Sequence, residues 1–155
     1  MTITASGLYV ANWIDILDAT QLAIDLSLTT HRLALYNNTH TPNFSTDTAY
    51  TATNEVSGTG WAAGGVTLAT AATGGTSTAP TTTESPTGTL MYDMGDVSVA
   101  STTLTNARGV MLYADALAGN NAIVLVNFGA DFSTVAGTFG IQWAAGGVFN
   151  IDLTP

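Results

Sequence analysis

The sequence predicts a mainly β protein: an antiparallel β-sandwich or jelly-roll-like fold with one N-terminal α-helix. Many short segments alternate apolar with polar or small residues and are bounded by Gly, Pro, Asn or Asp, which is the pattern of half-buried strands. The 155 residues include 28 threonines and 16 glycines, a composition that favours hydroxyl-covered β surfaces joined by many turns. A chain of this length is the size of one domain, and we expect residues 1–155 to share one core.

The N-terminal helix is predicted over residues 6–23, because apolar side chains recur there three or four positions apart. These positions are Leu8, Ala11, Ile14, Leu17 and Leu22. Ser6 precedes the first of them and is the predicted N-cap. From Ile24 to Leu35 the apolar spacing changes to two, which predicts strand. The sandwich itself is expected over about residues 29–155.

The rest of the predicted sandwich is a series of short strands separated by turn residues. These strands are residues 65–69, 88–93, 96–100, 109–114, 122–127, 138–143 and 148–153. Residues 37–64 form a long connection rich in Thr and Asn, and a connection of that length is usually functional or packed against something. Residues 70–88 are rich in Thr, Gly, Ala and Pro, and this low complexity predicts an extended arm or loop.

The charge of the chain excludes several classes of partner. It carries 11 Asp and Glu against two cations, both arginine, for a formal net charge of -9. Two arginines cannot neutralise a run of phosphates or hold an anionic bilayer, so we expect neither nucleic acid nor membrane as a partner. No stretch reaches 18 apolar residues, and the first residues lack the basic and apolar regions of a secretory signal. The absence of cysteine excludes disulfides and thiol chemistry.

Candidate catalytic groups are few, and we predict that the protein is not an enzyme and holds no cofactor or metal. His31 and His40 belong to no recognised catalytic or metal-binding motif. Asp93, Asp96 and Asp115 could supply oxygen ligands to calcium, but the sequence around them lacks the alternating acidic pattern of a calcium loop. Turn positions, where Asp and Gly are common, are the favoured interpretation of these acids.

Four residues are candidates for an interface. Phe44, Tyr50 and Trp61 lie in the irregular stretch 37–64 rather than in a predicted strand, so their rings are the aromatic groups best placed to meet a partner. Arg108 begins a predicted strand, and because cations are so few, we expect it to pair with an Asp of this chain or of a neighbouring subunit. In the second case it would form an intersubunit salt bridge.

Three stretches are distinctive in combination. They are NEVSGTGWAAGGVTL at residues 54–68, NARGVMLYAD at 106–115 and VLVNFGADFSTVAGTFGIQWAAGGVFNI at 124–151. Together they resemble a family of small structural proteins of tailed bacteriophages. The resemblance covers most of the chain beyond Thr29 and is weakest over 70–88, and Trp61 stands where a tyrosine is more familiar. It implies a virion component, often a head decoration or cement protein and sometimes a minor structural or tail protein.

Three hypotheses follow from these observations. In the favoured one, the protein is made in the bacterial host cytoplasm and decorates the capsid exterior, bound to the major capsid protein and assembled as a homotrimer at local threefold positions. The second places it in the tail or in a fibre as an adaptor or host-binding module, with Phe44, Tyr50 and Trp61 as binding aromatics. The third is a carbohydrate-active or calcium-dependent lectin-like domain, which requires the three aspartates named above to bind a metal.

Overall fold

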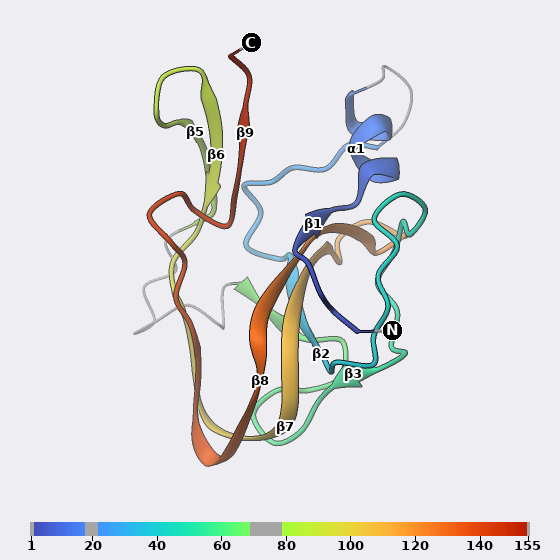
Figure 1. Ribbon diagram of the computed structural model, residues 1–155, viewed down its shortest axis with the longest axis vertical. Helices are drawn as coiled ribbons and strands as arrows, with labels where there is room; N and C mark the ends of the chain where they lie inside the picture. The colour runs from blue at the N-terminus through green and yellow to red at the C-terminus, as the bar shows by residue number, and fades with distance from the viewer. Residues whose placement is uncertain (1, 18–21, 69–78, 155) are drawn as a thin grey trace.

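Antiparallel sheets and a short helix near the N-terminus make up the described part of the chain, as Figure 1 shows. The structure is a computed structural model, and it describes residues 2–17, 22–68 and 79–154. Its elements, in chain order, are β1 (Gly7–Leu8), α1 (Val10–Leu17), β2 (Arg32–Tyr36), β3 (Glu55–Val56), β4 (Val66–Thr67), β5 (Thr81–Glu84), β6 (Thr89–Asp93), β7 (Val97–Ala114), β8 (Asn121–Ile141) and β9 (Phe149–Asp152). The predicted fold class is confirmed: the protein is mainly β and sandwich-like, with one helix near the N-terminus.

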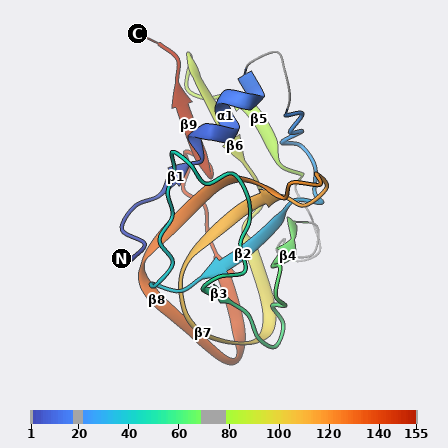
Figure 2. The same cartoon turned by 90° about the vertical axis from the view of Figure 1, so that its right-hand side faces the viewer.

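The strands form two sheets. The larger sheet has the order β1-β8-β7-β2-β3, with β4 also paired to β2, and the smaller sheet has the order β5-β6-β9. Figure 2 shows β3 and β4 near opposite ends of β2. Both therefore share the edge of β2 that β7 does not occupy.

The central strand β2 is buried on both faces because it lies between two hydrophobic clusters. Leu33 and Leu35 belong to the larger cluster, whereas Ala34 and Tyr36 belong to the smaller one. Successive side chains of a strand point to opposite faces of a sheet, so the large sheet separates the two clusters. Tyr92 of β6 also lies in the larger cluster, which therefore joins the two sheets.

Strands β7 and β8 form one long hairpin that bends back on itself. They pair antiparallel along their length, with several shifts of register between Val99 and Gly109. Such shifts are β-bulges, which bend a strand and increase its twist. In Figure 1 the hairpin runs down from its turn, bends at the lower end of the molecule and rises again towards β6 and β9. Residues from both arms enter the larger cluster, so one hairpin supplies two of its walls.

The sequence predicted four separate strands where the structure has these two. Residues 96–100 and 109–114 fall largely within β7, and residues 122–127 and 138–143 fall largely within β8. The middle parts of both strands lack a period of two because the bulges interrupt the alternation of side chains. Several non-glycine residues there have positive φ, such as Asn106 at 57°, a conformation that a regular strand does not contain.

Arg108 ties β7 to the segment of β8 that leaves the register of the pair. Its Nε lies 2.6 Å from Oδ1 of Asp131, and its guanidinium also donates to the carbonyl oxygen of Gly129 at 2.8 Å. Both partners lie between Asn127 and Phe132, where β7 and β8 shift register. Of the two partners expected for Arg108, the structure contains the aspartate of its own chain.

The N-terminal helix is shorter than predicted, because the chain first adds a strand to the large sheet. β1 pairs with β8, and the hydroxyl of Ser6 accepts a hydrogen bond from the N–H of Asn127 at 2.8 Å. Ser6 is therefore not the N-cap, and α1 begins at Val10. Residues 18–21 of the predicted helix lie outside the described part of the chain. No helix within the described ranges is long and apolar enough to cross a membrane.

The predicted strand over residues 24–28 is wrong, since these residues contain a turn. Asp25 accepts hydrogen bonds from the N–H and the hydroxyl of Ser27 at 2.9 and 2.6 Å. Local bonds of this kind compete with strand pairing for the backbone. Alternation of apolar residues was therefore not sufficient where an aspartate could close a turn.

The arm predicted over residues 70–88 is also partly wrong. Its described part includes β5, which pairs antiparallel with β6, while residues 69–78 lie outside the described part. All four residues of β5 are exposed, and threonine favours strand on such a surface even without an apolar face. The neighbouring strands β6 and β9 match the predictions at 88–93 and 148–153.

We expect Arg108 and Asp131 to stabilise the fold as a coupled pair. Replacing either with alanine should lower the free energy of unfolding by about 1–2 kcal/mol, measured by urea denaturation. The loss of unfolding free energy in the double variant should be smaller than the sum of the two single losses. The difference, which is the coupling energy, should be about 0.5–1 kcal/mol for this partly exposed pair. Arg32→Ala combined with Asp131→Ala is the control, because these two side chains belong to different ion pairs. Additive losses for Arg108 and Asp131 would contradict the role assigned to the pair.

Candidate binding surface

Trp61 lies in the larger cluster rather than on the surface. Its side chain is fully buried, and its ring meets that of Phe139 edge-on at 5.5 Å. Gly58 and Trp61 exchange backbone hydrogen bonds of 2.8 and 3.1 Å, which closes a tight turn against β7. A Cβ at Gly58 would lie only 2.2 Å from the carbonyl oxygen of Thr103, so glycine is required there. In this conformation the ring offers no surface to a partner.

Phe44 and Tyr50 are half-buried and fasten the long connection to the rest of the fold. The ring of Phe44 packs on Tyr9 at 5.4 Å, and that of Tyr50 stacks on Tyr113 at 4.7 Å. The hydroxyl of Tyr50 donates to Oε2 of Glu55 at 2.6 Å. Burial, together with this carboxylate, raises the pKa of the Tyr50 hydroxyl well above its usual value, so the hydroxyl stays protonated and keeps donating.

The helix α1 is fastened to the large sheet by its polar side. Asn12 is buried, and its Nδ2 donates to the carbonyl oxygens of Thr48 at 2.7 Å and Ala122 at 2.6 Å. The indole N–H of Trp13 donates to the carbonyl oxygen of Ile123 at 3.3 Å. Two residues near the start of the helix therefore fix its position, because each has partners on the sheet or on the adjoining loop.

An apolar stripe on α1 faces solvent. Its residues are Val10, Ile14 and Leu17, whose exposed fractions are 48%, 58% and 80%. The spacing of four and three places them on one face of the helix. The face turned to the sheet carries Asn12 and Trp13 instead. We call Val10, Ile14 and Leu17 the helix stripe.

The basic side chains are all neutralised or buried. Arg32 pairs with Asp115 at 2.8 Å, and Arg108 pairs with Asp131. His31 and His40 are buried, and burial lowers the pKa of each imidazole below its usual range. The sequence contains no other arginine or histidine and no lysine. The two arginines and two histidines thus present no unpaired positive charge at pH 7.

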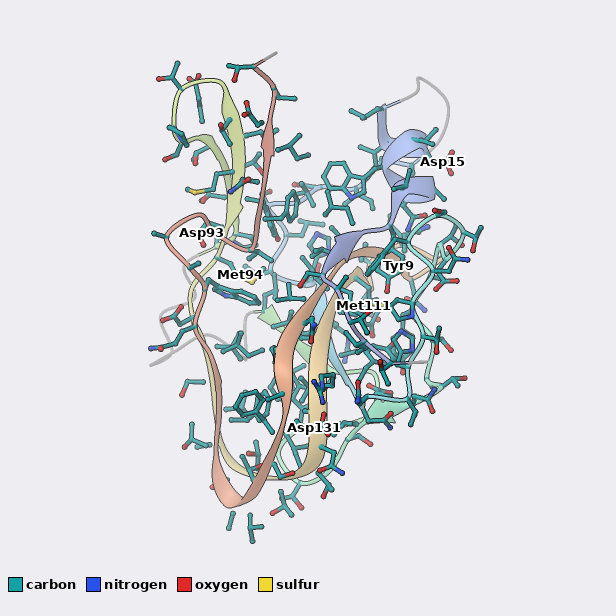
Figure 3. All side chains as sticks on the ribbon, in the orientation of Figure 1. Tyr9, Asp15, Asp93, Met94, Met111 and Asp131 are labelled. Carbon is teal, nitrogen blue, oxygen red and sulfur yellow. The ribbon has the colours of Figure 1, made fainter. Side chains whose placement is uncertain are left out.

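The three aspartates considered for calcium serve separate local roles. Asp93 accepts from the N–H of Met94 at 2.9 Å, and Asp96 accepts from the N–H of Trp143 at 3.0 Å. Asp115 pairs with Arg32, as described above. Figure 3 places Asp93 beside the smaller sheet, away from the end of β7 that precedes Asp115. Within the described residues, no three His, Asp or Glu side chains gather as a metal site.

Because His31 and His40 are buried, we expect the protein to lose stability in mild acid. An imidazole in the unfolded chain has a pKa of about 6.5, and burial lowers the pKa of both histidines in the folded chain. The unfolded state therefore binds more protons than the folded state below about pH 6.5. The free energy of unfolding is thus highest above that pH and declines as the pH falls. We expect the free energy of unfolding to fall between pH 7 and pH 5, by at most about 1.4 kcal/mol per pH unit for each histidine.

Urea denaturation at several pH values measures this decline. The variant His31→Gln, His40→Gln is the control, compared at each pH with its own value at pH 7. The free energy of unfolding of this variant should change little between pH 7 and pH 5. An equally steep decline in that variant would show that other groups cause it.

No protein-family model, no curated protein and no solved structure matches the chain.

Proposed function

We propose that the protein is a non-enzymatic structural component of a tailed-bacteriophage virion. It binds as a decoration protein to the outer surface of the major capsid protein shell and stabilises that shell. The observation that carries this proposal is the helix stripe, an apolar surface held rigidly on the sheet by Asn12 and Trp13. The resemblance of residues 54–68, 106–115 and 124–151 to small phage structural proteins supplies the identity of the partner.

The helix stripe suits a contact that is repeated many times. Full burial of a Val, Leu or Ile side chain is worth about 1.5–3 kcal/mol, and these three are half to four-fifths exposed. Covering them would yield about 3–5 kcal/mol per copy before the entropic cost of docking. One such contact is weak, but linked copies on a symmetric shell bind far more tightly than one copy. A homotrimer would provide that linkage.

The surface charge also favours a fixed structural contact. Only 8% of the residues are charged, and the two arginines are already paired within the chain. A threonine-rich, weakly charged β surface can be covered without stripping water from many ions, which would cost free energy. Since the chain keeps a net charge of -9, neutral or basic parts of the shell are the preferred contacts.

The number of copies per virion tests the proposal. A stained gel of purified virions, calibrated on the major capsid protein, should show hundreds of copies, and particles lacking the protein should lose their DNA at a lower temperature. A few copies located at the tail would instead indicate the tail or fibre adaptor. Absence from purified virions would overturn both.

Substitution of the helix stripe tests the docking surface. We expect Ile14→Asp with Leu17→Asp to lower the occupancy of the shell at least about tenfold, because a loss of 1.4 kcal/mol already has that effect. Val135→Asp is the matched control, since Val135 is 86% exposed and lies on β8 rather than on the helix. Equal occupancy for both variants would exclude the helix stripe as the contact.

A further inference from the structure

The outer edge of β8 lacks a neighbouring strand over most of its length. β1 pairs with Val124 and Leu125, and a bridge from Ala49 to Asn121 covers the start of the strand. Beyond Asn127, which donates to Ser6, no described strand pairs with that edge. The outer edge of β7, by contrast, is covered by β2 and, further along, by a bridge between Thr59 and Thr103. The two edges of the same bent hairpin thus differ: one is covered and the other is open.

An aromatic groove of about 490 Å³ lies along this open edge. Its lining comes from residues 126–143 and includes Phe128, Phe132, Phe139 and Trp143. Phe128 lies 6.0 Å from Phe132 and 6.2 Å from Phe139, measured between ring centroids. These rings are brought together because β8 bends between them. We call this the β8 groove.

The β8 groove opens into the side of the larger cluster. Phe139 is buried there and contacts Trp61, which closes the cluster on the β7 side. On the β8 side, Phe132 remains 49% exposed. The indole N–H of Trp143 already donates to the carbonyl oxygen of Gly95 at 3.1 Å, so the indole needs no polar partner from outside.

The backbone beside the groove is suited to an extended chain. Residues 139–141 pair in regular register with residues 97–99 of β7, so alternate N–H and C=O groups of this segment point away from β7. An unpaired edge next to an apolar groove is the arrangement by which sheets add a strand from another chain: backbone hydrogen bonds give affinity and pockets select side chains.

The charge of the protein favours a different polypeptide over a second copy at this edge. A second copy would bring another net charge of -9 and only paired arginines, so it offers the edge no electrostatic attraction. A segment that carries lysine or arginine would be attracted instead.

We propose that an extended segment of another polypeptide docks on β8. It pairs with the edge at residues 138–141 and inserts an apolar side chain between Phe128, Phe132 and Trp143, with basic residues flanking that side chain. This docking site is separate from the helix stripe and does not depend on the proposed function.

A random library of twelve-residue peptides, selected on the immobilised full-length protein, provides the probe. Selected peptides should contain alternating apolar residues with Lys or Arg nearby, and a synthetic copy of one should bind in calorimetry. Phe132→Asp should weaken that binding at least about tenfold, as removal of a central aromatic contact does. Val135→Asp adds the same charge on an exposed residue of the same strand outside the groove lining and should change binding less than about twofold.

Amide hydrogen exchange locates the bound peptide and completes the test. Protection on binding should be confined to residues 126–143. Thermal unfolding of each variant should remain a single transition well above the temperature of the binding experiment, since Phe132 and Val135 both lie outside the buried core. Selection of no peptide, equal effects of the two substitutions, or protection elsewhere would overturn the proposal. So would a wild-type dimer, seen by light scattering, that Phe132→Asp dissociates, because the occupant would then be a second copy.

Discussion

The bend in the β7–β8 hairpin is the constraint on which the rest of the fold depends. Without it, a strand of the length of β8 would extend far past the large sheet, and the larger cluster would lose one of its walls. The bulges bend the hairpin, and Arg108 ties the displaced segment of β8 back through Asp131 and Gly129. Arg108, one of only two arginines in a chain without lysine, is thus bonded within its own hairpin and is not available to pair with a partner.

The fold class could be predicted from sequence because most strands obey a period of two. β6, β9 and the regular parts of β7 and β8 were found in this way. The continuity of the long strands could not be predicted, since bulges interrupt the alternation, as at Asn106 with its positive φ. The helix was predicted, but the spacing of its apolar residues could not show which face meets the sheet, because that depends on the two carbonyl groups that the amide of Asn12 finds there.

The interface residues were harder to predict than the strands. Phe44, Tyr50 and Trp61 were chosen because they lie in an irregular stretch, but a position in a loop does not determine the direction of a side chain, and all three pack inward. The exposed apolar side chains lie instead on regular elements, such as Ile14 on α1 and Phe132 on β8. Their apolar character was visible in the sequence, but their exposure depends on how the helix docks and where β8 bends.

The pairing of β1 with β8 also constrains how the chain folds as it is made. β1 and α1 find their partners at residues 122–125, more than a hundred positions later in the sequence. During synthesis the N-terminal segment must therefore wait, with its apolar side chains uncovered, until most of the chain has left the ribosome. Long-range pairing of this kind slows folding and prolongs the exposure of aggregation-prone surface. Translation speed and chaperone supply should thus affect the yield of folded protein.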